Sequence, residues 1–177
     1  KMFFDYVNSG SWTETTYNEN VSDFQKIKLR QRVAIDMSNR TLETKMIGQK
    51  VAMPMAIAPT GLTGMQRADG EILAAQAAEE FGIPYTLSTM SVCSIEAVAE
   101  KTKNPFWFQL YVMKDKKFME RLIDRAKAAK CSALVLTLDL QLLGQRHKDI
   151  RNGLSTPPKL VPKHIYQVLT RPVWCMR

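Results

Sequence analysis

The chain has 177 residues, of which 45% are hydrophobic and 24% charged, and a formal net charge of +8 at pH 7. This composition is typical of a soluble globular protein, and the length suits a single domain with an ordinary core. The longest apolar runs, residues 51–58 and 133–136, are far shorter than the roughly 20 residues of a membrane-spanning helix. We therefore expect no segment that crosses a bilayer.

The cysteines and histidines indicate neither a disulfide framework nor a zinc site. Cys93, Cys131 and Cys175 are an odd number at wide spacing, which is typical of free thiols in a reducing compartment. No group of cysteines and histidines has zinc-ligand spacing. The N-terminal residues also lack the long apolar core of a signal peptide. We expect an intracellular protein without a metal.

The positive charge is concentrated in the last part of the chain. From Gln141 onward there are seven lysines and arginines against the single acid Asp149, so this part carries six of the eight net charges. Such a segment suits an anionic membrane surface, nucleic acid or an acidic substrate, and it equally suits a solvated flexible loop.

The predicted elements alternate after a helical or irregular start. Residues 41–50, with Gly48, are typical of a small hairpin or connecting loop. Buried strands are expected at residues 51–58, 84–87, 106–110 and 133–138. Asp69, Ser94 and Asp115 are placed to cap the helices that follow the first three strands, and Gly82 to end the first of these helices.

This alternation predicts an α/β protein with right-handed βαβ units and a parallel sheet. An open doubly wound sheet and part of a closed barrel both fit the pattern. Residues 59–64 read PTGLTG, which is neither the dinucleotide-binding G-x-G-x-x-G nor a P-loop. The dinucleotide-binding form of the open sheet is therefore disfavoured.

Each predicted strand ends in a short polar group. These groups are Pro59-Thr60-Gly61, Ser88-Thr89, Gln109-Leu110-Tyr111 and Thr137-Leu138-Asp139. Because the carboxyl ends of parallel strands open on one side of a sheet, we expect the four groups to converge on a single ligand.

Five motifs in order carry a family resemblance. They are residues 57–61 (IAPTG), 86–88 (TLS), 108–111 (FQLY), 136–139 (LTLD) and 144–153 (GQRHKDIRNG). From about Asp5 to about Lys159 the chain resembles the FMN-dependent α-hydroxy-acid dehydrogenases and oxidases, most closely their bacterial respiratory L-lactate dehydrogenase branch.

The resemblance implies a TIM (β/α)₈ barrel, which needs about 250 residues. The 177 residues then form the first half, about four βα units, of a single but incomplete domain. Residues 1–50 are the expected N-terminal helical extension, residues 51–140 the four strands with their helices, and residues 141–177 a long basic loop.

The resemblance also implies which residues contact FMN. Backbone groups of Pro59, Thr60 and Gly61 are expected near the reactive centre of the ring, and the side chains of Ser88, Gln109 and Thr137 to hydrogen-bond its polar edge. Without the resemblance, each is only a polar residue at a strand end.

The implied substrate residues are Tyr6, Tyr111 and Arg146. A guanidinium holds a 2-hydroxy carboxylate bidentately, and a phenol orients its hydroxyl. The alternatives are a Tyr6 that packs the N-terminal segment and an Arg146 that is one more solvated base. Asp139 is expected to support a catalytic histidine, with a structural cap as its alternative.

No catalytic base is assigned within the chain. His147 lies in a basic loop, and neither it nor His164 has the family context, so the base histidine is expected beyond residue 177. The implied reaction is oxidation of L-lactate to pyruvate, by hydride transfer to the flavin or by a carbanion route, with electrons passing to a respiratory quinone or electron carrier. The alternatives are an oxidase of glycolate or another 2-hydroxy acid that uses oxygen, and an inactive half-barrel or FMN-binding fragment.

The basic tail gives the partner predictions. Lys163, Arg171 and Arg177 are interspersed with Ile165, Tyr166, Val168, Leu169, Val173, Trp174 and Met176. This mixture suits an interfacial segment on an anionic membrane, and a loop packed on its own protein is the alternative. We expect a peripheral protein on the cytoplasmic face of the inner membrane, or a cytoplasmic one, that assembles with copies of itself into a tetramer. No nucleic-acid motif is visible, so we expect no nucleic-acid partner.

Overall fold

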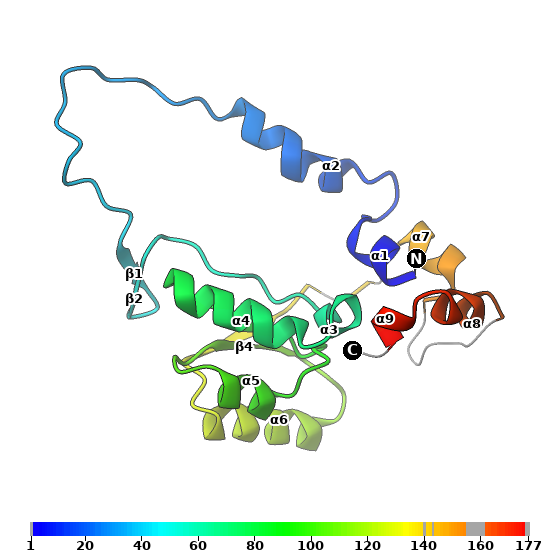
Figure 1. Ribbon diagram of the computed structural model, residues 1–177. Coiled ribbons are helices and arrows are strands. Elements are labelled where there is room, and N and C mark those ends of the chain that lie inside the picture. The colour runs from blue at the N-terminus through cyan, green and yellow to red at the C-terminus, as the bar shows by residue number, and fades with distance from the viewer. Residues whose placement is uncertain (1, 140, 143, 155–161, 176–177) are drawn as a thin grey trace. The chain divides into compact units, whose positions relative to one another are not determined.

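The computed structural model describes residues 2–139, 141–142, 144–154 and 162–175 (Figure 1). The chain forms two compact units, one of residues 40–141 and one that joins residues 1–39 to residues 142–177. The elements are α1 (Met2–Val7), α2 (Thr15–Ser22), η1 (Asp23–Lys26), β1 (Thr44–Met46), β2 (Gln49–Val51), α3 (Thr63–Gln66), α4 (Gly70–Phe81), β3 (Thr86–Leu87), α5 (Ile95–Lys101), β4 (Trp107–Tyr111), α6 (Lys116–Ala128), β5 (Ala133–Thr137), α7 (His147–Asn152), α8 (Pro162–Leu169) and α9 (Pro172–Cys175).

The unit of residues 40–141 contains a parallel sheet in the order β3-β4-β5. Leu87 pairs with Phe108, and Tyr111 pairs with Thr137 at the carboxyl ends of β4 and β5. The predicted α/β class with parallel strands is therefore confirmed.

The strand expected over residues 51–58 is wrong for most of its length. Val51 ends β2, and only Ile57 makes an isolated parallel bridge, to Tyr85. Pro54 lies between them and has no N–H to donate to a strand ladder. The apolar run marks burial here more than it marks a strand.

The hairpin expected within residues 41–50 is present as the antiparallel pair β1-β2. Gly48 sits in its turn with φ of +78°, in the left-handed region that suits glycine. The Trp107 Nε1–H donates to Gln49 Oε1 at 3.2 Å. The hairpin thus contacts the beginning of β4.

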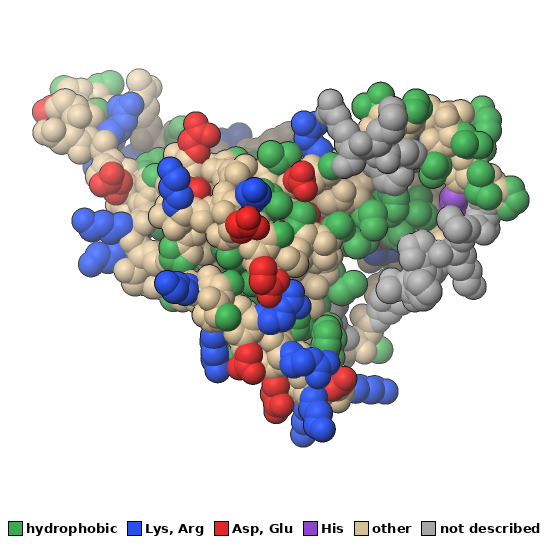
Figure 2. Space-filling view, turned by 60° about the horizontal axis from the view of Figure 1, so that its bottom comes forward, with side chains coloured by type: hydrophobic (Ala, Val, Ile, Leu, Met, Phe, Trp, Pro, Cys, Tyr) green, Lys and Arg blue, Asp and Glu red, His purple; other side chains and the backbone are tan. Residues whose placement is uncertain are grey.

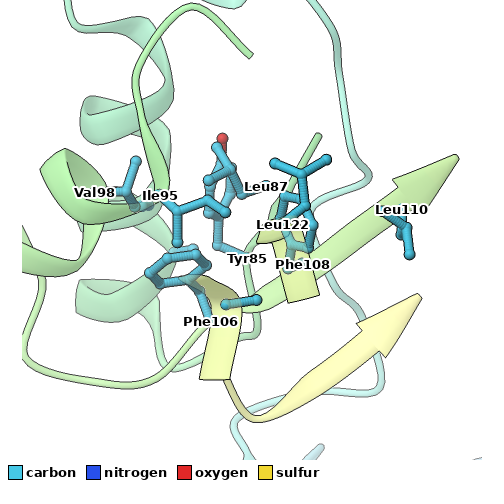
Figure 3. Close-up of a cluster of buried hydrophobic side chains, with 11 residues drawn as sticks. Tyr85, Leu87, Ile95, Val98, Phe106, Phe108, Leu110 and Leu122 are labelled. Atoms are coloured by element: carbon cyan, nitrogen blue, oxygen red, sulfur yellow. The ribbon is translucent and has the colours of Figure 1, made fainter. Parts of the chain in front are cut away.

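One face of the sheet packs against α4, α5 and α6. Figure 3 shows Leu87, Phe108 and Leu122 lying together, with Ile95 and Val98 of α5 in the same buried cluster. The opposite side of α6 is solvated, and Figure 2 shows basic and acidic side chains interspersed on this part of the surface. The expected amphipathic helix is confirmed.

The predicted helix ends are confirmed except at one position. Ser94 Oγ accepts from the Ala97 N–H at 3.1 Å and Asp115 Oδ1 from the Phe118 N–H at 3.0 Å, and Gly82 ends α4 in the left-handed conformation. Asp69 precedes α4, but it has φ of +57° and its side chain makes no capping hydrogen bond. Its left-handed backbone turns the side chain away from the capping geometry.

In the other unit, α1 and α7 pack together. The long loop expected over residues 141–177 contains α7, α8 and α9, so it is more helical than predicted. As expected, Pro172 interrupts the helix there, because α8 ends at Leu169 and α9 begins at the proline. Within the described residues, no helix is long and apolar enough to cross a membrane.

Candidate functional site

A row of polar side chains runs across the carboxyl ends of β3, β4 and β5, with Gln109 at its centre. The Gln109 Nε2–H donates to Thr137 Oγ1 at 2.8 Å, and Gln109 Oε1 accepts from the Thr89 N–H at 3.1 Å. The Ser88 hydroxyl lies 3.4 Å from the same oxygen. Ser88 and Gln109 are buried, and Thr137 is half-buried. Three residues predicted to contact FMN are thus brought together.

Thr89 belongs to this row; the sequence placed it in one of the four groups expected at the ligand, but it predicted no individual role for Thr89. Its hydroxyl donates to the Gln109 carbonyl oxygen at 2.5 Å and accepts from the Tyr111 N–H at 3.3 Å. Thr89 therefore bonds both the side chain and the backbone of β4. Its position next to Ser88 in a strand-ending group was the only sequence signal.

The loop of Pro59, Thr60 and Gly61 joins the same end of this unit. The Thr63 hydroxyl donates to the Thr60 carbonyl at 3.1 Å, and the Leu62 N–H donates to the Met90 carbonyl at 3.0 Å. The loop after Ile57 is therefore bonded to the loop after β3. Pro59 and Gly61 are half-buried and Thr60 is exposed.

The donor set of this row fits an isoalloxazine ring. The ring edge presents carbonyl oxygens and ring nitrogens, which need small groups that both donate and accept hydrogen bonds. The hydroxyls of Ser88 and Thr137 and the amide of Gln109 are such groups. A cavity of about 250 Å³ in the same unit is separate from this polar row. It is lined by Gln49, Glu79 and other residues near the amino ends of the strands.

In the other unit, the structure brings the predicted substrate residues Tyr6 and Arg146 together. The Arg146 guanidinium lies 5.0 Å from the centre of the Tyr6 ring, and its Nη2 donates to the Tyr6 carbonyl and, at 3.3 Å, to Ser9 Oγ. Its Nε donates to Asp149 Oδ2. Arg146 is therefore a packed and oriented side chain, which disagrees with the solvated alternative.

Asp149 is a second residue whose place was not predicted from the sequence. It is buried, and its Oδ1 has no hydrogen-bond partner within the described part of the chain. A buried carboxylate beside a guanidinium fixes the orientation of that guanidinium. The Arg-x-x-Asp spacing across the start of α7 was the available signal.

The remaining candidates are less enclosed. Asp139 is exposed just after β5. His147 is exposed and stacks at a tilt on Trp12, with ring centres 5.6 Å apart. His164 Nε2 lies 2.9 Å from the Asn152 carbonyl oxygen. Neither histidine belongs to a cluster with Cys, Asp or Glu that suits a metal, among the residues that the structure describes.

Comparison with known proteins assigns the family. The FMN-dependent dehydrogenase family profile matches residues 1–177. The chain belongs to this family. Its members are FMN-dependent, which agrees with the donor set across β3, β4 and β5.

Two curated relatives of the chain are L-lactate dehydrogenases from Vibrio. The protein from Vibrio parahaemolyticus serotype O3:K6 is 46% identical over 175 residues, which cover 99% of this chain and 46% of that protein. The protein from Vibrio cholerae serotype O1 (strain M66-2) is 48% identical over 173 residues, covering 98% of this chain and 46% of that protein. The chain therefore spans about half the length of these relatives.

Among solved structures, the chain is similar to the monotopic membrane protein (S)-mandelate dehydrogenase. The TM-score is 0.88 at 32% identity, covering 99% of this chain and 47% of that one. It is also similar to mandelate oxidase, with a TM-score of 0.80 at 35% identity, covering 87% of this chain and 45% of that one. Members that act as dehydrogenases and as oxidases thus share this structure.

Proposed function

We propose that this chain is the FMN- and substrate-binding half of an L-lactate dehydrogenase that converts L-lactate to pyruvate. The observation that carries the proposal is the polar row of Ser88, Gln109 and Thr137 in a chain 46–48% identical to L-lactate dehydrogenases. The row supplies the hydrogen-bonding groups that a flavin ring needs, and the identity favours lactate.

The proposed architecture is the first four βα units of a TIM barrel. The helix-facing side of β5 supports this reading, because Leu134 and Leu136 are 47% and 50% exposed, whereas their partners Phe108 and Leu110 are buried. An apolar edge of this kind needs a further strand and helix to cover it. We propose that a second half supplies them, together with the catalytic base histidine and the flavin phosphate site.

Each predicted site residue has a proposed role. The amide and hydroxyls of Gln109, Ser88 and Thr137 hydrogen-bond the polar edge of the flavin, while backbone groups of residues 59–61 approach its reactive centre. FMN supplies two-electron redox chemistry when bound. The residues of this chain bind and orient the reactants and do not themselves start the proton transfer.

The substrate roles follow from charge. Arg146 binds the lactate carboxylate, with its orientation set by Asp149, and the phenols of Tyr6 and Tyr111 hydrogen-bond the substrate. Asp139 supports the base histidine of the second half as a hydrogen-bond acceptor. The expected boundaries at residue 50, after the N-terminal extension, and at residue 140, before the long basic loop, are also part of the proposal.

We further propose transfer of electrons to a respiratory quinone or carrier, attachment to the cytoplasmic face of the membrane, and a tetramer. The name of the solved monotopic mandelate dehydrogenase supports attachment. So do the exposed Ile165, Tyr166 and Leu169 of α8. Arg177 lies outside the described residues, as do the side chains of Lys163 and Trp174. Deleting residues 160–177 should release the protein from anionic vesicles in co-sedimentation, and an unchanged bound fraction would reject attachment through this segment.

The test of the activity is spectroscopic. The protein made with its second half should show a flavin spectrum that bleaches when L-lactate is added without oxygen. A panel of lactate, glycolate and mandelate decides the substrate, and readmission of oxygen decides between a dehydrogenase and an oxidase. Rapid recovery of the spectrum in oxygen would favour the oxidase alternative that the mandelate oxidase similarity supports.

A further inference from the structure

We infer that Glu71 is a positioning residue for the cofactor wall, because one carboxylate holds together the loop that carries residues 59–61 and the loop that carries Ser88. We call this arrangement the Glu71 clamp. The inference rests on the proposed function, since its consequence is measured through FMN binding.

The clamp consists of two hydrogen bonds to one oxygen. Glu71 lies in the first turn of α4 and has no exposed surface. Its Oε1 accepts from the Gly64 N–H at 2.9 Å and from the Val92 N–H at 3.0 Å. Gly64 lies in α3, which directly follows the loop of residues 59–61, and Val92 follows Ser88 in the loop after β3. A single buried group thus fixes both loops to one helix.

The backbone at Gly64 packs closely against Val92 and Glu71. A Cβ on Gly64 would lie 2.6 Å from Val92 Cβ and 2.9 Å from Glu71 Oε2. The Leu62 N–H also donates to the Met90 carbonyl at 3.0 Å. The two segments that the clamp joins are therefore in direct contact.

The acceptor in the clamp is an ionised carboxylate, which accepts more strongly than a neutral amide oxygen. Burial alone raises the pKa of Glu71, but the hydrogen bonds from the Val92 and Gly64 N–H groups and from the Cys93 thiol together outweigh it, so that the net pKa is below its ordinary value. Burial and Glu71 together raise the pKa of the neighbouring Cys93 thiol to about 11. At neutral pH the pair is therefore an ionised carboxylate beside a protonated thiol, and truncating Glu71 leaves two N–H groups without their acceptor.

The loop that Val92 ends is hydrogen-bonded to the polar row. The Met90 N–H donates to Ser88 Oγ at 3.1 Å within the same loop, and the Thr89 N–H donates to Gln109 Oε1. Val92 anchors the far end of this loop. Loss of the clamp should therefore displace Ser88 and Thr89, which contact Gln109, and not only loosen α4.

Glu79 offers a matched control on the same helix. Its Oε1 also accepts two backbone N–H groups, from Lys103 at 2.9 Å and Asn104 at 2.6 Å. These residues precede β4, at the amino ends of the strands. Removing the Glu79 carboxylate also breaks two hydrogen bonds from backbone N–H groups, but these groups lie outside the loops that carry residues 59–61 and Ser88.

The experiment compares Glu71→Gln and Glu71→Ala with Glu79→Gln and Glu79→Ala in the protein that includes its second half. FMN affinity is measured by fluorescence titration of the apoprotein, and amide hydrogen exchange is measured at residues 64 and 92. We expect the Glu71 variants to raise the Kd for FMN about 10- to 100-fold, the range found for supporting residues at metal sites, with Glu71→Gln less affected than Glu71→Ala. Exchange at both amides should accelerate. The Glu79 variants should keep the wild-type Kd.

Equal Kd values for the Glu71→Ala and Glu79→Ala proteins, or unchanged exchange at residues 64 and 92 in Glu71→Ala, would overturn the inference. If Glu71→Ala does not fold, the partial effect of Glu71→Gln, whose neutral amide oxygen is a weaker acceptor than the carboxylate, decides the question. A wild-type protein that binds no FMN would refute the proposed function instead, and the two exchange rates would still decide whether Glu71 holds the loops.

Discussion

Gln109 is the residue whose replacement perturbs the polar row most directly. Gln109→Leu keeps most of the side-chain volume but removes the amide that accepts from the Thr89 N–H and donates to Thr137 Oγ1. Gln76→Leu is the matched control, because Gln76 is exposed and donates only at the surface, to the Lys101 carbonyl at 3.0 Å.

The cost of Gln109→Leu can be estimated from these bonds. The Thr89 N–H loses its acceptor in a half-buried position, which costs about 1–3 kcal/mol of unfolding free energy. The half-exposed Thr137 hydroxyl can turn to water and adds little. The flavin loses one neutral hydrogen-bonding partner, worth about 0.5–1.5 kcal/mol, so the Kd for FMN should rise about two- to tenfold.

The assay pairs urea unfolding with FMN titration of the apoprotein that includes the second half. Gln109→Leu should lower the unfolding free energy and weaken FMN binding, while Gln76→Leu should stay within about 0.5 kcal/mol of the wild type. A Gln109→Leu protein with wild-type values in both measurements would refute the assigned role of the row.

Three further changes test other parts of the molecule. In steady-state kinetics, Arg146→Lys should lower kcat/KM for lactate about 10- to 100-fold, because one ammonium cannot make the paired hydrogen bonds of a guanidinium. The control Arg151→Lys should leave kcat/KM unchanged, and wild-type kinetics for Arg146→Lys would reject the substrate role. The hydrogen bond from Arg125 lowers the pKa of Glu96 to about 2 from 4.5, so the pair stabilises the fold above pH 4.5 and its contribution is lost as the pH falls toward 2. The difference in unfolding free energy between wild type and Glu96→Gln, below about 1 kcal/mol for such an exposed pair, should therefore vanish between pH 4.5 and pH 2. A difference that stays constant over this range would contradict the pairing. Ser94→Ala should cost about 1 kcal/mol in urea unfolding through loss of the α5 cap, and an unchanged midpoint would contradict it.

The elements that local sequence determines were predictable. Ser94 and Asp115 cap α5 and α6 by accepting hydrogen bonds from N–H groups three residues further along the chain. The four-residue spacing of Leu122 and Ala126 marks the buried side of α6. The strand prediction for residues 51–58 was wrong because hydrophobicity indicates burial, whereas strand pairing depends on distant partners and on the N–H that Pro54 lacks.

In the candidate site, too, some residues were predictable from the sequence and others were not. Ser88, Gln109 and Thr137 were predictable as neighbours because parallel strands bring their carboxyl ends to one edge. Glu71 was not, because its partners Gly64 and Val92 come together only in the folded chain. A buried carboxylate in a first helical turn looks in sequence like any acid that complements the helix dipole.

The most direct test of the central claim is anaerobic reduction of the flavin by L-lactate in the protein that contains this chain and its second half. The account predicts an FMN spectrum that bleaches with L-lactate and yields pyruvate in equal amount to the flavin reduced. A protein that purifies without flavin and cannot be loaded with it, or whose flavin no 2-hydroxy acid bleaches, would contradict the account.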